Sequence, residues 1–197
     1  DPFTGTGTFI VRLLQSGIIQ KNDLERKFKS EIHANELVLL AYYIASINIE
    51  ESYHEISGGE YLPFVGGVLT DTFQLTGAQA QGDFEAALVE DHKRAEKQKK
   101  MPMQVVIGNP PYSVGQGDAN ANNQNLDYPD LDSRIRSTYA AQSTAINKNS
   151  LYDSYVRAIR WATDRIGNEG VVGFVTNGDF IDSTSADGIR KILPREF

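Results

Sequence analysis

Apolar and polar residues follow one another along the chain in blocks that predict short strands separated by helices. Short runs near residues 30–36, 66–70, 104–108 and 171–176 each end in a polar or turn-forming residue, as buried strands commonly do. Between the last two runs, apolar residues recur at helical spacing over residues 151–166. This alternation predicts an α/β fold with a doubly wound, mainly parallel sheet.

Further helices are predicted after the glycine-rich start of the chain and at about 37–50, 82–100, 131–144 and 185–193. The helix at 37–50 carries apolar residues on several faces, and we therefore expect most of it to be buried. The stretch 113–150 is dense in Asn, Asp, Ser, Gln and Gly. We expect it to be a mobile polar insert that buries little.

Composition narrows the possible functions. The 197 residues are enough for one domain with a sizeable core, and we expect residues 1–197 to form it. The chain has no cysteine, which excludes disulfides and thiol nucleophiles, and its three histidines are scattered, so no metal site is predicted. A net charge of −7 argues against this chain alone providing the main binding surface for nucleic acid. We interpret the basic run at 96–100 as a solvated helix end. No run is long and apolar enough to predict a membrane span.

The strand at 104–108 runs directly into Asn109, Pro110, Pro111 and Tyr112. Proline cannot donate to a sheet ladder, so the strand has to stop at Asn109, at the strand end where open α/β sheets bind ligands. This corner offers an amide, carbonyls without competing N–H donors and an aromatic ring. Such a set could hold a flat molecule that bears an amino group. The alternative is a proline-rich turn that only closes a buried strand.

Three other segments carry candidate binding groups. Asp1 begins a loop with Gly5 and Gly7, which would let the backbone turn tightly before a helix and approach a ligand. Glu36 and Asp71 follow two of the predicted strands, and an acid at such a position can hold ribose hydroxyls. Each signal is ambiguous alone: many loops contain Gly-x-Gly, and Glu36 could simply be a first-turn acid of the next helix.

The order of these motifs resembles that of the S-adenosylmethionine-dependent DNA methyltransferases that modify exocyclic amino groups. The motifs are the Asp-Pro-x-x-Gly-x-Gly loop, then the two acids, then the Asn-Pro-Pro-Tyr corner. The resemblance implies a Rossmann-like class I methyltransferase core. It implies that Asp1 and the loop of Gly5 and Gly7 hold the methionine end of S-adenosylmethionine. It places Glu36 on the ribose hydroxyls and Asp71 on the adenine amino group of the cofactor.

The resemblance also places a target base against Asn109, Pro110 and Tyr112, next to Pro111. It implies direct methyl transfer to a base flipped out of double-stranded DNA, with no covalent intermediate and no metal. The remaining cofactor contacts that it implies are Phe3, Thr4, Leu37, Thr72, Phe73 and Asn109.

The kind of DNA methyltransferase can be narrowed further. Cytosine C5 methylation needs a cysteine nucleophile, which the chain lacks. Only about thirty residues separate the Asp71 strand from Asn109, so we expect the target-recognition domain beyond Phe197, as in the γ class. In that class the Asn-Pro-Pro-Tyr signature usually marks N6-adenine enzymes.

The blocks around 107–115, 149–155 and 174–181 look most like the methylase part of type ISP single-polypeptide restriction–modification enzymes. The first strand of that family is missing before Asp1, so we expect an N-terminally truncated core. The resemblance implies a cytoplasmic bacterial or archaeal protein. It also implies helicase, nuclease and target-recognition domains in the same longer polypeptide.

Other functions fit parts of the pattern. The same tetrapeptide occurs in amino or amide methyltransferases that act on RNA or on a protein glutamine. A module that binds cofactor or DNA without turnover is also open. A dinucleotide dehydrogenase is disfavoured, because the loop after Asp1 lacks the third glycine of that fingerprint.

Overall fold

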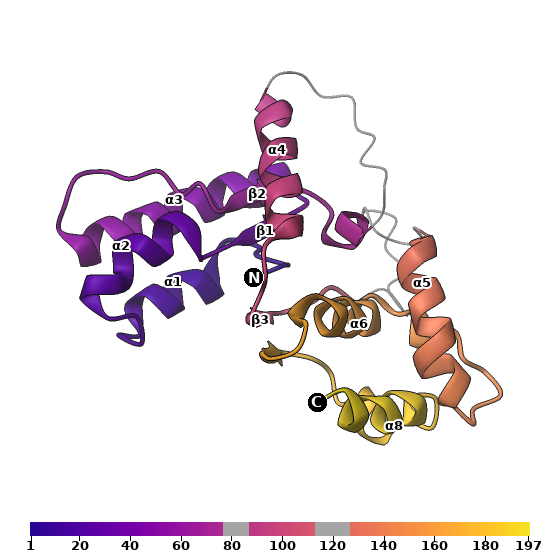
Figure 1. Ribbon diagram of the computed structural model, residues 1–197. Coiled ribbons are helices and arrows are strands. Elements are labelled where there is room, and N and C mark those ends of the chain that lie inside the picture. The colour runs from indigo at the N-terminus through magenta and orange to yellow at the C-terminus, as the bar shows by residue number, and fades with distance from the viewer. Residues whose placement is uncertain (77–86, 113–126) are drawn as a thin grey trace. The chain divides into compact units, whose positions relative to one another are not determined.

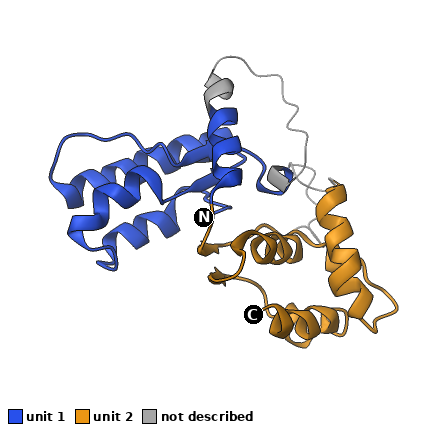
Figure 2. Ribbon diagram, in the orientation of Figure 1, with its two compact units in different colours: residues 1–101 blue, residues 102–197 orange. Residues whose placement is uncertain are grey.

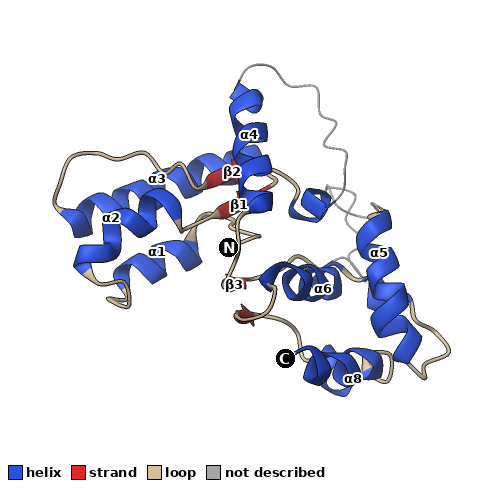
Figure 3. Cartoon of the chain, viewed as in Figure 1, coloured by secondary structure: helices blue, strands red, loops and turns tan. Residues whose placement is uncertain are grey.

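The fold is α/β, with two pairs of short parallel strands that alternate with helices along the chain (Figure 3). It is seen in a computed structural model that describes residues 1–76, 87–112 and 127–197. The chain divides into two compact units, Asp1–Met101 and Pro102–Phe197 (Figure 2). Each unit has its own hydrophobic core.

The first unit holds two strands, a 3₁₀ helix and four α-helices among its described residues (Figure 1). In chain order these are α1 (Thr8–Gln15), α2 (Lys21–Ser30), β1 (Ala34–Glu36), α3 (Leu39–Ser57), β2 (Gly67–Leu69), η1 (Thr72–Thr76) and α4 (Ala87–Lys100). The strands pair in parallel, with Asn35 opposite Val68. We expected the first strand to begin near residue 30, but Ser30 closes α2, and the strand is only three residues long.

The core of the first unit lies between α1, α2, α3 and the strands. Phe28 of α2 is fully buried, and its ring stacks on Tyr53 of α3 with 3.9 Å between the centroids. Gly7 begins α1 with φ 90°, and a Cβ there would lie 3.2 Å from the Ile49 side chain and 3.3 Å from the Ala45 backbone. The glycine therefore allows α1 to start directly against α3.

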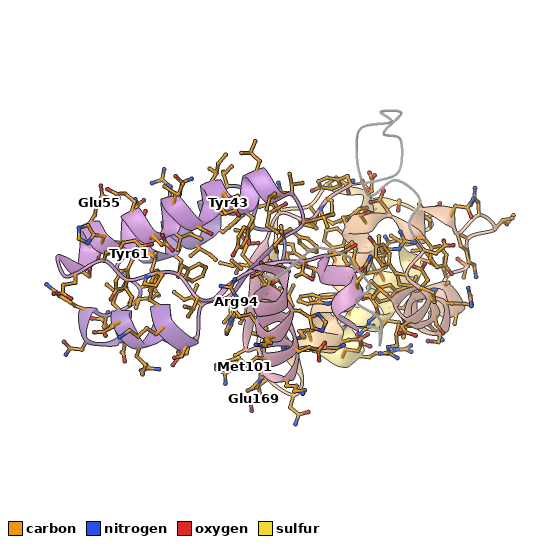
Figure 4. All side chains as sticks on the ribbon, turned by 90° about the horizontal axis from the view of Figure 1, so that it is seen from above. Tyr43, Glu55, Tyr61, Arg94, Met101 and Glu169 are labelled. Carbon is orange, nitrogen blue, oxygen red and sulfur yellow. The ribbon has the colours of Figure 1, made fainter. Side chains whose placement is uncertain are left out.

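Our expectation that the helix after the first strand is mostly buried was wrong for the first half of α3. Its core face is the set Ala45, Ile49, Ser52 and Tyr53. The apolar residues before and along the first turns are largely exposed, among them Leu40 at 69% and Tyr43 at 56%. Figure 4 labels Tyr43 and Glu55 near the two ends of this helix. A helix with apolar residues on several faces has no sequence signal that selects the side facing the core.

The second unit has β3 and β4 as its strands, with helices between and after them. Its elements in chain order are β3 (Val105–Gly108), α5 (Pro129–Ile135), the π-helix η2 (Arg136–Ala140), the 3₁₀ helix η3 (Asn149–Tyr152), α6 (Ser154–Ile166), β4 (Val171–Phe174), α7 (Asp179–Asp182) and α8 (Asp187–Glu196). The strands pair in parallel from Val105 opposite Val171 to Gly108 opposite Phe174. The predicted helix at 151–166 is confirmed as α6, and Asp153 caps it by accepting a 3.2 Å hydrogen bond from the Tyr155 N–H.

The polar stretch 113–150 differs from our expectation where it is described. Residues 113–126 lie outside the described part, so the expectation of mobility is not tested there. Within α5 and η2, however, Leu131, Ile135 and Tyr139 are at most 2% exposed, and Ile135 and Tyr139 belong to the core of the second unit. Their spacing of four residues places all three on one helical face, although polar residues surround each of them in the sequence.

We predicted that all four strands join one sheet. The structure pairs them as two two-stranded sheets, one in each unit. Within the first unit, residues of the Asp1 loop hydrogen-bond to the edge of β1 that does not face β2. The expectation of a single domain over residues 1–197 stays a prediction. No helix in the described part of the chain is long and apolar enough to cross a membrane.

Candidate active site

The loop that begins the chain lies along β1. The Asp1 amino group donates to the His33 carbonyl at 2.8 Å, and the Asn35 N–H donates to the Asp1 carbonyl at 2.9 Å. The Thr4 N–H donates to the Asn35 carbonyl at 3.0 Å. These bonds hold Asp1 and Thr4 alongside β1.

Glu36 binds the glycine loop directly. One carboxylate oxygen, Oε2, accepts a 2.7 Å hydrogen bond from the Gly5 N–H, and the other, Oε1, accepts a 2.8 Å bond from the Val38 N–H. Gly5 has φ 57°, and a Cβ there would have no neighbouring atom within 4 Å. The space beside Gly5 is therefore open to a ligand. Glu36 ends β1 and lies before the first turn of α3, so it is not a first-turn acid of that helix, although it binds the N–H of Val38 at the helix start. Its role in holding ribose hydroxyls stays a prediction.

The Asp71 segment lies against the same loop. The Thr72 hydroxyl donates to the Pro2 carbonyl at 2.5 Å, and the rings of Phe3 and Phe73 lie 5.4 Å apart, tilted by 57°. Asp71 is buried, and its Oδ1 accepts a 3.0 Å bond from the Phe73 N–H. The predicted cofactor residues of the first unit thus meet at one end of the β1–β2 pair. Leu37, which follows Glu36, is 39% exposed.

One polar atom of this cluster has no protein partner in the described structure. Asp1 Oδ1 accepts a 3.1 Å bond from the Phe3 N–H, but Asp1 Oδ2 is buried and accepts no hydrogen bond from the residues described. An unpaired buried carboxylate oxygen is unfavourable, and a bound cationic group would satisfy it. The Glu36 carboxylate also has lone pairs left for two hydroxyls. The cluster therefore fits a ligand with an ammonium group and a diol.

The second unit contains the Asn-Pro-Pro-Tyr corner. Asn109 follows β3 and is exposed, whereas Pro110 is fully buried. Val175 closes the corner from the end of β4: its N–H donates to the Gly108 carbonyl, and its carbonyl accepts from the Tyr112 hydroxyl, both at 3.0 Å. One residue at the end of β4 thus holds both the residue before the corner and the last residue of it.

Tyr112 lines a cavity of about 350 Å³ within the second unit. Tyr155 of α6 lines it too, and the two ring centroids are 5.8 Å apart. Asp153 and Asp179 contribute carboxylates to the same wall. Burial first, then these two carboxylates, raise the pKa of Tyr155 to about 12, so its hydroxyl is neutral over the physiological range. An aromatic and polar cavity of this kind suits a flat, uncharged, hydrogen-bonding molecule better than an anion.

Our sequence reasoning did not single out two residues of this corner. Tyr155 was predicted only as part of the buried face of the helix at 151–166 and as part of a block that carries the resemblance, and its position two residues after the Asp153 cap is the signal that could have placed it at the corner. Val175 acts through its backbone, which no side-chain motif can reveal. The placement of Asn109 relative to Glu36 and Asp71 stays a prediction, because these residues belong to different units.

Residues 19–196 match the family described as the Eco57I restriction-modification methylase. This match covers most of the chain. The chain belongs to the Eco57I restriction-modification methylase family.

Solved structures agree with this family. The Eco57I-family chain is similar to a nuclease-deletion mutant of the type ISP restriction-modification enzyme LlaGI in complex with a DNA substrate mimic, with a TM-score of 0.91 and 49% identity over 100% of this chain. The DrdV–DNA complex matches with a TM-score of 0.89 and 47% identity over 100% of the chain. The ATP-dependent type ISP enzyme LlaBIII bound to DNA matches with a TM-score of 0.88 and 47% identity over 98%.

The Eco57I-family chain spans only 17% of the LlaGI chain, 19% of the DrdV chain and 13% of the LlaBIII chain. A comparison with curated proteins found no match. The resemblance to the methylase part of type ISP enzymes is therefore confirmed, and it concerns a small part of those polypeptides.

Proposed function

We propose that this chain transfers a methyl group from S-adenosylmethionine to N6 of adenine in double-stranded DNA, as the modification activity of a restriction–modification enzyme. Membership of a restriction-modification methylase family supports the methyl transfer, and the DNA complexes of similar enzymes support DNA as the substrate. The observation that carries the finer assignment is the corner of residues 109–112, closed by Val175 beside an aromatic cavity.

The residues of the first unit would hold the cofactor. The buried Asp1 Oδ2 is available to the ammonium of its methionine end, and the open space beside Gly5 leaves room for it. Glu36 would accept the ribose hydroxyls, while Leu37 or Phe73 would lie beside the adenine ring. When bound, S-adenosylmethionine supplies an electrophilic methyl group on a sulfonium.

The corner would prepare the target nitrogen. The lone pair of an adenine amino group is delocalised into the ring, which makes the nitrogen a poor nucleophile. Asn109 Oδ1 and the Pro110 carbonyl would accept its two hydrogens and favour a pyramidal nitrogen. Neither proline has an N–H that could compete for these acceptors. Preorganised acceptors of this type typically contribute on the order of 3 kcal/mol to catalysis.

Tyr112 would bind the base itself. A base has to leave the duplex to reach the corner, which costs a few kcal/mol. Stacking on the Tyr112 ring would return about 1–3 kcal/mol of that cost. We further propose that helicase, nuclease and target-recognition domains belong to the same polypeptide, because this chain spans at most 19% of the similar enzymes.

Product analysis tests the proposal. The full-length polypeptide encoded by the gene is incubated with S-adenosylmethionine carrying a tritiated methyl group and, in separate reactions, duplex DNA, RNA and a glutamine-containing protein. The DNA is then digested to nucleosides. We expect label in N6-methyldeoxyadenosine only.

Label in N4-methylcytosine, RNA or protein would contradict the adenine or DNA assignment. Cofactor binding by calorimetry without transfer to any of the three substrates would instead indicate a binding module without turnover.

A further inference from the structure

Tyr155 is placed to hold the Tyr112 ring. It lies in the first turn of α6, is 5% exposed, and its ring is 5.8 Å from that of Tyr112 with 36° between the ring planes. Its backbone is fixed by the bond from its N–H to Asp153, whose side chain is also buried. Tyr155 itself therefore has little freedom to move.

Among the residues that the structure describes, the Tyr112 side chain makes one hydrogen bond and also packs against the core of the second unit. Its hydroxyl donates to the Val175 carbonyl, and the residue is only half-buried. A single hydrogen bond at the tip of a ring does not by itself fix the plane of the ring, so its packing neighbours have to do so. The contact with Tyr155 restricts the tilt of the ring, because tilted aromatic pairs have preferred geometries.

Both rings also line the same cavity of about 350 Å³. A base that stacks on Tyr112 needs the plane of that ring to be set before it arrives, since ordering a side chain during binding weakens affinity. We propose that Tyr155 is a positioning residue that sets the plane of the Tyr112 ring for the target base. This inference rests on the proposed function of Tyr112.

Three variants separate positioning from a general packing role. Tyr155→Leu removes the ring but keeps an apolar side chain, and the Asp153 cap survives because it uses the backbone N–H. Tyr155→Phe keeps the ring. Tyr152→Leu is the matched control, because Tyr152 packs on the same core but does not line the cavity. Urea unfolding of all three checks that each is folded.

The first measurement needs no substrate. In protein labelled with ¹³C-tyrosine, relaxation of the Tyr112 ring signal reports how well the ring is ordered, and the signal is assigned by its loss in Tyr112→Phe. We expect the order of the ring to fall in Tyr155→Leu and to stay at the wild-type level in Tyr155→Phe and Tyr152→Leu. An unchanged Tyr112 ring in Tyr155→Leu overturns the proposal.

The second measurement is methyl transfer by the full-length polypeptide. Tyr155→Leu should lower kcat/KM for DNA about two- to tenfold, the range expected for loss of one aromatic pair, with cofactor KM unchanged. In a Tyr112→Ala background the same change should add no further loss, because the ring to be positioned is gone. An equal loss in both backgrounds overturns the proposal. If the wild type methylates no DNA, the proposed function fails, while the ring-order measurement still decides the role of Tyr155.

Discussion

The N–H of Gly5 donates a 2.7 Å hydrogen bond to the carboxylate of Glu36, thirty-one residues further along the chain. This bond joins the glycine loop to the end of β1, and together with the Thr72–Pro2 bond it gathers three sequence motifs into one cluster.

Glu36→Gln should weaken that cluster. Glutamine has one acceptor oxygen, so it cannot accept from both Gly5 and Val38 as the carboxylate does. A hydrogen bond to a charged group is worth roughly 1.5–3 kcal/mol, and half-burial reduces this to about 1 kcal/mol. We expect a matching loss in urea unfolding and at least tenfold weaker binding of S-adenosylmethionine by calorimetry. The exposed Glu55→Gln on α3 is the control and should change neither value.

Asp71→Asn tests cofactor binding with little structural disturbance. The introduced side chain would still accept from the Phe73 N–H through its amide oxygen, so the turn after β2 should persist. The substitution removes the negative charge and turns one acceptor oxygen into a donor. We predict weaker binding of S-adenosylmethionine with unchanged DNA affinity, measured by calorimetry and by fluorescence anisotropy. An equal loss of both affinities would show that Asp71 supports the fold rather than the cofactor.

Asn109→Ala should abolish methyl transfer in the full-length polypeptide and leave cofactor affinity nearly intact. Removing one preorganised hydrogen-bond partner typically costs about 3–4 kcal/mol, or a hundredfold to a thousandfold in rate. Asn22→Ala on the exposed face of α2 is the matched control. Transfer at the wild-type rate by Asn109→Ala would remove this corner from the active site.

Two changes at Tyr112 separate its ring from its hydroxyl. Tyr112→Ala removes the stacking surface, and a mismatch opposite the target adenine should partly rescue it by making extrusion easier. Tyr112→Phe keeps the ring but loses the bond to Val175, worth about 1 kcal/mol, so an effect of about fivefold or less is expected. Fluorescence of 2-aminopurine at the target position reports extrusion in both. Equal defects in the two variants would contradict the stacking role.

Acid sensitivity should be traceable to Asp187 of α8. Its carboxylate accepts from Lys191 Nζ and the Thr144 hydroxyl, both at 2.8 Å, and these bonds hold its pKa below the ordinary range, with the Lys191 bond first. A carboxylate with a lowered folded pKa stabilises the fold above its ordinary pKa of about 3.9, and this stabilisation is lost as the pH falls further. Asp187→Asn should therefore lower the free energy of unfolding at pH 7, with a smaller difference at pH 3. Urea unfolding at both pH values measures this, and a difference independent of pH would assign the effect to packing.

The sequence correctly predicted structural features that depend on the spacing and type of neighbouring residues. The face of α6 with Tyr155, Ala158, Ile159 and Ala162 is buried as expected, and the strand at 105–108 ends at the proline corner. Glu36 and the segment of Asp71 meet because they follow two parallel strands, which any parallel pairing brings to the same edge. The loop that begins at Asp1 joins them through hydrogen bonds that no local pattern predicts.

Features that depend on distant partners could not be predicted. The apolar residues of α3 lie on several faces and do not indicate which face packs on the core. Leu40 and Tyr43 were therefore expected to be buried, but they are exposed. Tyr139 was missed as a core residue because the polar residues around it obscured the helical spacing. The hydrogen bond from the Tyr112 hydroxyl to the Val175 carbonyl joins residues sixty-three positions apart, and no local rule encodes it.

That contact also has a consequence for biogenesis. A ribosome adds Tyr112 more than sixty residues before it adds Val175, so the Tyr112 hydroxyl has no acceptor from β4 until that strand emerges and pairs with β3. Because domains are assembled as synthesis proceeds, the corner should acquire its shape late, together with the β3–β4 pair. The corner is thus translated early within this unit but should reach its folded conformation late.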